Sequence, residues 1–474
     1  MTICVKIISL WMSLMLTITG WFGTMPVHTL QVNKAETYQT NEGFGTSAAW
    51  WAQNVNDEAE AEKIAELLYS KENGLGLDIY RYNVGAGEKE NPASIIAMES
   101  RKTESFWVKN ETTGEYEFDF SRDANAVRMM DLAVKYGASK IILFCNSPHF
   151  SLTENGLGSG SSEEGRCNLP QENYGAFVDY LLAVAEHFLK EGYPVYAISP
   201  INEPQWNWGT GWVSQEGCHY SPDEATALLE CFAVEMQRRN EAFKLLGPES
   251  GQMGVDSKEY EEKFYGSEIL RAYCDTYSGH SYWLDGNVNE KRATGERFAN
   301  EYPGLKFEMS EWCELPLTID STTIESGLRM ANVMWEDLTM MNAVSWQSWT
   351  AVNGDGMLDY QDGDLIFYKR YFTMKQFSMI PLGAVRIGVL DSHLEKTTLK
   401  TLAYSDDAAD YLIVINDTDD AQTVYLKGIY STKTIFVTSA DHDCEMVASG
   451  SLLRKTEILP KSITTIVMTK NPSL

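Results

Sequence analysis

The sequence predicts an α/β protein: a (β/α)8 TIM barrel with an attached side β-sandwich. Between residues 43 and 384, apolar strand segments alternate with helical segments eight times, which is typical of a (β/α)8 barrel. In residues 385–474 the helical period disappears, and short alternating strands separated by Asp, Gly and Asn turns indicate a β-sandwich. A chain of 474 residues is long enough for both units.

The first 28 residues predict a signal peptide, with an N-terminal anchor as the alternative. Lys6 precedes an apolar run from Ile7 to Thr19, and small residues follow near Gly20. The run is shorter than the roughly 20 residues of a membrane-spanning helix. This favours cleavage and secretion, with no membrane contact afterwards. Residues 29–42 alternate loosely and are expected to form a strand that joins the β-sandwich.

The eight barrel strands are expected where short apolar runs end in turn residues. They are placed at Glu42–Phe44, Leu77–Asn83, Lys140–Cys145, Tyr196–Ile201, Phe243–Leu246, Tyr277–His280, Leu305–Ser310 and Ala343–Trp346. The helices between them keep a 3.6-residue period, which is clearest from Tyr174 to Leu189. The run Ser221-Pro222-Asp223-Glu224 predicts a helix start, because it combines a capping box with proline at the first helical position.

Composition and charge narrow the class of partner. The formal net charge is −29, and such an excess of acid disfavours nucleic acid and other polyanions. It suits a neutral substrate better than a uronic-acid-rich polymer. The chain also contains 13 Trp and 24 Tyr, an aromatic content that is usual for carbohydrate-active enzymes.

No metal or cofactor is expected. The chain has no C-x-x-C pair and no H-E-x-x-H motif. Four acidic residues late in the barrel lack the spacing of an EF-hand loop and predict a solvated acidic loop. They are Asp355, Asp359, Asp362 and Asp364. Cys167 and Cys218 fall in loops on the same face, where they either form a disulfide or remain reduced.

Two glutamates at strand ends are the candidate catalytic residues. Glu203 follows the fourth strand in an Asn-Glu-Pro tripeptide, and Glu311 ends the seventh strand. The carboxyl ends of barrel strands carry the active site, and strands four and seven lie across the barrel mouth. Paired carboxylates cleave glycosidic bonds. Of the nearby acids, Glu308 lies inside its strand, and Glu314 is expected to be a solvated loop charge.

Other side chains beside strand ends are the candidate substrate-binding residues. Tryptophans there would stack on sugar rings, with Trp346 as the floor of the cleft, whereas Trp349 could equally serve packing. The full candidate set is Arg81, Asn202, Asn146, Trp50, Trp206, His280, Tyr282 and Trp346.

Several segments together resemble glycoside hydrolase family 30, a family of retaining (β/α)8 glycosidases. They are GFGTSAAWWA, GLGLDIYRYNVGAG, NSPHF, ISPINEPQWNW, GHSYW, FEMSEW and SMIPLGAVRIGV, and the resemblance covers nearly the whole chain. It implies that Glu203 is the acid/base and Glu311 the nucleophile. It also implies that Asn202 contacts the sugar 2-hydroxyl and that Arg81 supports the nucleophile.

Within that family, GTSAAWW and RYNVGAG look most like the endo-β-1,6-galactanase branch. This implies a secreted, monomeric enzyme that cleaves a neutral β-linked plant polysaccharide, with the β-1,6-galactan side chains of arabinogalactan as the expected substrate. The alternative enzyme is a xylanase, β-glucosidase, β-xylosidase or β-1,6-glucanase of the same family. The alternative from another class is a carbohydrate-binding protein on an inactive barrel. The chain departs from the usual family pattern at Ala48, His149 and Phe150, near the expected cleft.

Overall fold

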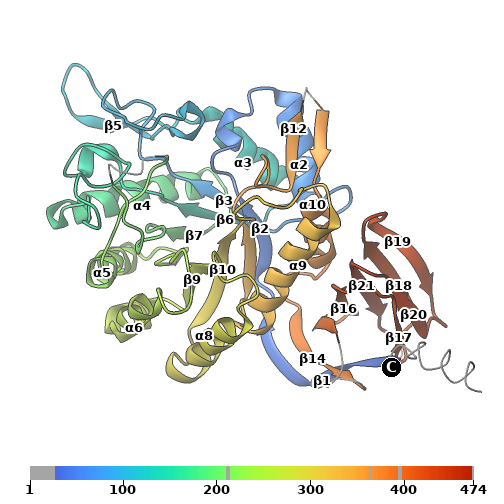
Figure 1. Cartoon of the computed structure of the whole chain (residues 1–474). Helices are drawn as coiled ribbons and strands as arrows, with labels where there is room; N and C mark the ends of the chain where they lie inside the picture. Colours follow the sequence, from blue (N-terminus) through green and yellow to red (C-terminus); the bar gives the residue numbers. More distant parts are fainter. Residues whose placement is uncertain (1–26, 210–213, 362–363, 393–397, 472–474) are drawn as a thin grey trace, which may run out of the picture.

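A closed parallel sheet forms the centre of the computed structural model, which describes residues 27–209, 214–361, 364–392 and 398–471. Its eight strands follow the order β8-β7-β6-β3-β2-β11-β10-β9, and every pair is parallel. Figure 1 labels six of these strands, β2, β3, β6, β7, β9 and β10, at the centre of the larger unit. A parallel bridge between Ser250 and Gly279 brings the two ends of the sheet together. The predicted (β/α)8 barrel is therefore confirmed.

Each barrel strand overlaps a predicted strand segment, and the ends differ by up to three residues. The strands are β2 (Gly43–Ser47), β3 (Ile79–Asn83), β6 (Lys140–Phe144), β7 (Val195–Ser199), β8 (Lys244–Leu245), β9 (Thr276–His280), β10 (Lys306–Trp312) and β11 (Ser345–Ser348). The helices are α2 (Glu58–Tyr69), α3 (Ala124–Tyr136), α4 (Tyr174–Lys190), α5 (Pro222–Arg239), α6 (Lys258–Gly266), α7 (Glu268–Tyr273), α8 (Val288–Glu301), α9 (Ile324–Thr339) and α10 (Lys369–Ser378). The predicted capping box starts α5, with Ser221 and Glu224 bonded reciprocally.

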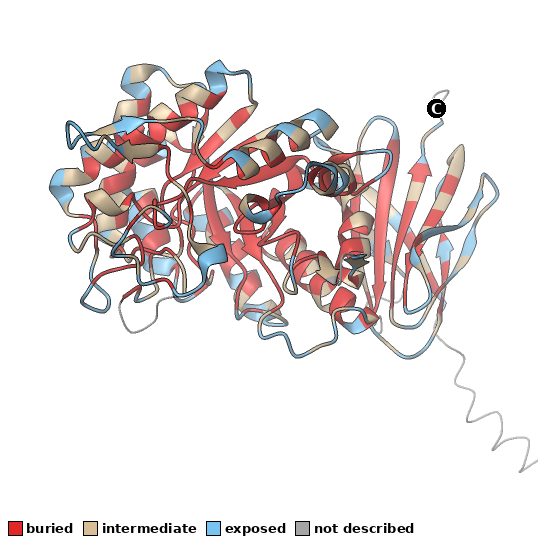
Figure 2. Ribbon diagram, turned by 90° about the horizontal axis from the view of Figure 1, so that it is seen from above, coloured by how far each residue is buried: buried red, intermediate tan, exposed pale blue. Residues whose placement is uncertain are grey.

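β3 and β9 are buried along their whole length. Figure 2 shows the mostly buried barrel strands with helices around the outside. Ile79, Ile142, Ala197 and Leu246 form an apolar cluster at the centre of the barrel. Successive strand residues alternate between the two faces. Arg81, two residues beyond Ile79, therefore points into the barrel at the carboxyl end of β3, where it is fully buried.

The second unit is a nine-stranded sheet in the order β19-β18-β21-β16-β15-β14-β1-β17-β20. Its strands are β1 (His28–Thr40), β14 (Val385–Asp391), β15 (Leu399–Ser405), β16 (Ala409–Asn416), β17 (Gln422–Leu426), β18 (Thr432–Thr438), β19 (Asp443–Gly450), β20 (Lys455–Ile458) and β21 (Ser462–Thr469). Strands from both ends of this order share one apolar core, because the sheet folds over itself. The expected attached sandwich is confirmed as part of the fold class.

β16 joins this sheet to the barrel. All eight of its residues are buried. Leu412 and Val414 pack in the core of the side domain, whereas Tyr411 and Ile413 belong to the large cluster that includes the barrel and its helices. The two faces of one strand thus serve two cores, which is why this strand lacks the apolar–polar alternation of a half-exposed strand.

The expected solvated acidic loop after β11 is not what the chain forms. β12 (Leu358–Gln361) and β13 (Asp364–Phe367) pair as an antiparallel hairpin. Asp359 accepts a 2.8 Å hydrogen bond from the Tyr368 hydroxyl, and Asp355 is half-buried. Asp364 is exposed, and Asp362 lies outside the described residues. A second hairpin, which sequence analysis missed, pairs β4 (Trp107–Lys109) with β5 (Tyr116–Phe118).

The expectation of a solvated charge at Glu314 is wrong. Its side chain is fully buried and accepts hydrogen bonds from Arg370 at 2.6 Å and from the Ser326 hydroxyl at 2.6 Å. Ser326 belongs to α9 and Arg370 to α10, so the carboxylate of Glu314 connects the loop after β10 to both helices. Glu314 thereby holds the loop that follows Glu311.

The two loop cysteines do lie together. Cys167 and Cys218 are near enough to shift each other's pKa, but they are not joined in a disulfide. The Cys167 thiol donates instead to the Leu169 carbonyl at 3.3 Å. The expected signal peptide lies almost entirely outside the described residues. Among the residues that are described, no helix is both long and apolar enough to cross a membrane.

Candidate active site

A cleft of about 1110 Å³ opens at the carboxyl ends of the barrel strands. Both candidate carboxylates, Glu203 and Glu311, line it. The remaining lining residues come from the loops that follow the strands. They are Trp50, Arg101, Ser162, Glu164, Trp206, Asn207, Trp208, Gly209, Ser214, Gln215, Tyr282, Trp283, Cys313, Leu315, Trp349 and Asp355. The cleft is therefore rich in indole rings and acidic groups, a lining that suits a neutral, ring-shaped ligand.

Glu203 follows β7 and has an unusual backbone conformation. Its φ of +47° lies in the left-handed region, which non-glycine residues seldom occupy. Its N–H donates to the carbonyl of Glu249 at 2.7 Å, and its carbonyl accepts from the Trp208 indole at 2.9 Å. Gly251 completes the support, because a side-chain carbon there would lie 2.6 Å from Glu203 Oε1.

Glu311 is the last residue but one of β10, and two donors hold its side chain. Arg81 Nη1 donates to its Oε2 at 2.9 Å, and the Tyr282 hydroxyl donates to its Oε1 at 3.0 Å. The carboxylate is only 4% exposed. The carboxylate lines the cleft. Because each of its oxygens accepts a hydrogen bond, its orientation is fixed.

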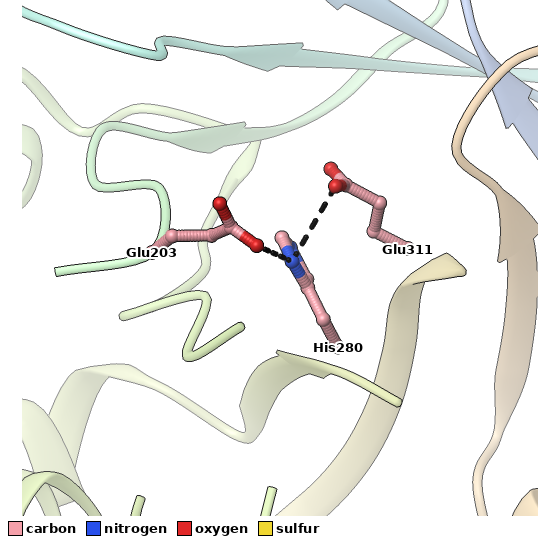
Figure 3. Close-up of side chains that lie close together, drawn as sticks. All are labelled: Glu203, His280 and Glu311. Atoms are coloured by element: carbon pink, nitrogen blue, oxygen red, sulfur yellow. Dashed lines mark hydrogen bonds and ion pairs between the residues drawn. The ribbon is translucent and has the colours of Figure 1, made fainter. Parts of the chain in front are cut away.

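His280, at the end of β9, lies between the two carboxylates (Figure 3). Its Nδ1 is 3.1 Å from Glu203 Oε1 and 3.5 Å from Glu311 Oε1. One ring nitrogen of His280 and one oxygen of each carboxylate lie within 4.8 Å of one another. One oxygen of Glu203 and one oxygen of Glu311 are thus no more than 4.8 Å apart, so both carboxylates can reach the same glycosidic bond.

The charges of this cluster shift the pKa values of its members. Burial lowers the pKa of His280, but the carboxylates of Glu311, Glu203 and Glu249 outweigh it and raise that pKa to about 9. Burial raises the pKa of Glu311 to about 7, and the charges of His280 and Arg81 oppose that rise. The carboxylates thus favour the imidazolium form of His280, and that form in turn favours ionised carboxylates around it.

Four of the predicted substrate-binding residues lie behind the carboxylates, in the barrel. Arg81 Nη2 donates to Asn202 Oδ1 at 3.1 Å, and Asn202 Nδ2 donates to Asn146 Oδ1 at 3.1 Å. These three side chains and His280 are almost completely buried. They connect strand ends β3, β6, β7 and β9, and they orient the carboxylates from below. The contact of Asn202 with a sugar hydroxyl stays a prediction.

The structure differs from expectation in which tryptophans line the cleft and which are buried. Trp50 and Trp206 line the cleft, and Tyr282 does so as well. Trp346 does not: it is fully buried, and its indole donates to Asp337 of α9 at 2.9 Å. A stacking floor at Trp346 is therefore wrong, because this residue faces the helix side of β11. Trp349, three residues later, lines the cleft instead and meets Trp50 edge-on, with 5.2 Å between ring centroids.

Sequence analysis missed a third buried carboxylate in the site. Glu249 follows β8, is 1% exposed, and accepts a hydrogen bond from Arg81 Nη2 at 2.6 Å. Its Oε2 also lies 3.1 Å from His280 Nε2. Burial alone would raise its pKa, but Arg81 and His280 lower it to about 2. The signal was present, since Glu249 follows the fifth strand as Glu203 follows the fourth.

Known proteins resemble this chain in both sequence and structure. An endo-β-1,6-galactanase of Hypocrea rufa is 26% identical over 379 residues, which cover 74% of this chain and 74% of that enzyme. An exo-β-1,6-galactobiohydrolase of Bifidobacterium longum subsp. longum is 24% identical over 227 residues, or 36% of this chain and 15% of that enzyme. The crystal structure of a conserved exported protein from Bacteroides fragilis superposes with a TM-score of 0.84 at 23% identity, over 93% of this chain and 100% of that one.

The sequence model of O-glycosyl hydrolase family 30 matches residues 27–367, which is more than half of the chain. That match spans β1, the whole parallel barrel and both carboxylates of the cleft. The family resemblance that the motifs indicated is thereby confirmed. The chain is a glycosidase and belongs to O-glycosyl hydrolase family 30.

Proposed function

We propose that this glycosidase hydrolyses β-1,6-linked galactan by a retaining double displacement. The observation that carries the mechanism is the approach of the two carboxylates, whose nearest oxygens lie within 4.8 Å. Retaining enzymes place their carboxyl groups about 5–5.5 Å apart, so that one of them attacks the sugar directly. Glu311 is the nucleophile and Glu203 the acid/base.

The surroundings of each carboxylate support these roles. Arg81 donates to Glu311 Oε2, and Tyr282 donates to its Oε1. Both donors favour the ionised form that attacks the anomeric carbon. Glu203 lies on a turn that lines the cleft, where it can donate a proton to the leaving oxygen and later deprotonate a water molecule.

The sugar and the linkage are proposed from the relatives and from the cleft. The two relatives described above act on β-1,6-linked galactose, and both align with this chain. Trp50, Trp206 and Trp349 present indole faces or edges to the cleft, which suits the flat apolar face of galactose. We further propose that the enzyme is secreted and acts as a monomer on the β-1,6-galactan side chains of arabinogalactan.

Hydrolysis of a panel of polysaccharides tests the substrate. The panel contains debranched arabinogalactan, β-1,6-galacto-oligosaccharides, glucuronoxylan and the β-1,6-glucan pustulan, and reducing ends are measured. We expect galactan to be cut fastest, with no need for a uronic acid substituent. A strict requirement for glucuronate-substituted xylan, or preferred cleavage of pustulan, would contradict the proposed sugar. Product configuration, followed by NMR during the first turnovers, tests the mechanism separately, and retention is expected.

A further inference from the structure

One buried carboxylate in the site has no part in the double displacement. Glu249 does not line the cleft and is 1% exposed, so it cannot touch the sugar. A buried carboxylate must find compensating partners. Glu249 finds two that belong to the active site, Arg81 at 2.6 Å and His280 at 3.1 Å.

The main chain of Glu249 also supports Glu203. Its carbonyl accepts the N–H of Glu203 at 2.7 Å, and Asn202 forms an isolated parallel bridge with Glu249. These contacts hold Glu203 in the left-handed backbone conformation, with φ at +47°, which persists only where neighbours enforce it. Glu249 thus contacts the backbone of Glu203 directly and its side chain through His280.

The number of N–H groups that the His280 ring carries depends on Glu249. Both ring nitrogens face carboxylate oxygens, Nδ1 towards Glu203 and Nε2 towards Glu249, each at 3.1 Å. A neutral imidazole has a single N–H, whereas an imidazolium has two. Only the imidazolium donates to both carboxylates. Glu311 also faces the ring, with its Oε1 3.5 Å from Nδ1, and Arg81 adds positive charge from the far side of Glu249 and Glu311.

A charge balance leads to the same protonation state. With an ionised nucleophile at Glu311, a protonated acid at Glu203 and an ionised Glu249, the buried site carries two negative charges. Arg81 and an imidazolium at His280 supply two positive charges. With Glu249 ionised beside Arg81, the resting state is therefore neutral only when His280 is charged, and a buried net charge is strongly unfavourable.

We propose, resting on the roles given to Glu203 and Glu311 above, that Glu249 is a positioning residue: it keeps His280 doubly protonated, and His280 then binds Glu203 Oε1. The catalytic proton of Glu203 is thereby confined to Oε2. After that proton has passed to the leaving oxygen, the imidazolium stabilises the carboxylate that remains on Glu203.

The variant Glu249→Gln tests this assignment, since it keeps the shape of the side chain and removes its charge. On β-1,6-galactan we expect kcat/KM to fall about 10- to 100-fold, because acid catalysis is impaired. In this proposal, the alkaline limb of the pH profile reports the loss of a proton from the His280 imidazolium. That limb should move to lower pH by at least about one unit, because the imidazolium has lost the counter-charge of Glu249. On 2,4-dinitrophenyl β-1,6-galactobioside, whose leaving group needs no proton, kcat/KM should change less than about 3-fold.

Glu261→Gln is the matched control. Glu261 lies on α6, away from the cleft, and is fully buried. It forms a 2.6 Å ion pair with Arg297 of α8. This variant should lose stability and leave the pH limb in place. An unshifted limb in Glu249→Gln, or an equal loss of kcat/KM on both substrates, would overturn the positioning role.

A measurement on the wild-type chain needs neither a variant of Glu249 nor any substrate. Long-range nitrogen–proton NMR of the histidine-labelled protein at pH 7 should show both His280 nitrogens protonated, with the signal identified by its loss in His280→Asn. A neutral ring would overturn the proposal. If the enzyme cuts a sugar other than galactose, the proposed substrate fails while this result stands. If it inverts configuration, the catalytic roles fail as well.

Discussion

At the scale of single residues, three carboxylates share one buried site and are told apart by their partners. Arg81 bonds to both Glu311 and Glu249, and His280 faces all three acids. Glu203 is the most accessible of the three, with a side chain that is 12% exposed. An acid/base must exchange protons with substrate and water, whereas a nucleophile must only reach the anomeric carbon. The greater exposure of the Glu203 side chain, compared with that of Glu311, agrees with this difference.

Replacing either catalytic glutamate should separate the two roles. Glu311→Ala should lose nearly all turnover, and azide should restore it on an activated aryl glycoside with an α-glycosyl azide as product. Glu203→Ala should still react with that aryl glycoside but fail on polysaccharide, and azide should then give the β-azide. NMR of the two azide products is the measurement. Exchanged configurations would reverse the assignment.

Replacing two neighbouring tryptophans should separate binding from packing. Trp349→Ala removes a ring that lines the cleft, so kcat/KM should fall roughly 5- to 150-fold, which corresponds to about 1–3 kcal/mol. Trp346→Ala removes a fully buried ring and should cost about 3–5 kcal/mol of unfolding free energy. Kinetics and denaturant titrations on both variants give the comparison. A Trp346→Ala enzyme of unchanged stability would contradict the packing role.

At the scale of elements, buried carboxylates hold the loops that form the cleft. Glu216 is fully buried, accepts from the backbone N–H of Ala86 at 3.2 Å and is hydrogen-bonded to the Thr103 hydroxyl. It immediately follows Gln215, which lines the cleft. The loop after β7 is therefore attached to the loop after β3 through a single acidic side chain.

This attachment makes stability depend on pH. Burial raises the pKa of Glu216 from 4.5 to about 8. Between those pH values the folded chain binds a proton that the unfolded chain has lost, so its contribution to stability is complete below pH 4.5 and disappears as pH rises through about 8. Glu216→Gln mimics the protonated form. It should melt at a higher temperature than the wild type at pH 9, and the difference should shrink at pH 5.

The exposed Glu172 provides the control for that experiment. Glu172→Gln should leave the difference between the melting temperatures at pH 5 and pH 9 as it is in the wild type. Calorimetry at both pH values gives the comparison. If Glu216→Gln showed the same pH dependence as the wild type, Glu216 would not be the group that titrates.

At the scale of the whole molecule, the N-terminal strand joins the two units. β1 pairs with β14 in an antiparallel register and with β17 in a parallel one, and the chain then enters the barrel at β2. Leu30 lies in the core of the side domain, while Gln39 donates to carbonyls of Leu338 and Ala343 beside the barrel. The side domain is thus built from both ends of the chain.

Two truncated chains should show how much depends on β1. A chain that begins at residue 27 retains the whole strand and should fold with full activity. A chain that begins at residue 42 removes the strand between β14 and β17 and leaves two unpaired edges inside the sheet, which favours aggregation. Soluble yield and circular dichroism of the two chains are compared. A soluble, active shorter chain would show that the barrel folds without a complete side sheet.

The order of strands and the position of the two carboxylates could be predicted from the sequence alone. Apolar runs that end in polar residues identify strand ends, and parallel strands bring those ends to one face of the barrel. The sequence therefore places Glu203 and Glu311 on the same face of the barrel. Most of the family motifs lie at these same strand ends, and together they indicated the family correctly.

Only the tertiary structure decided which side chains face the cleft and which are buried elsewhere. Trp346 lies inside β11, whereas Trp349 directly follows the last residue of that strand, and the sequence does not show where the strand ends. Glu314 looks like a loop charge until α10 brings Arg370 to it from 56 residues away. Glu249 becomes part of the site through partners 31 and 168 residues distant. Such contacts join separate elements, so the local sequence can place Glu249 at a strand end but cannot name its partners.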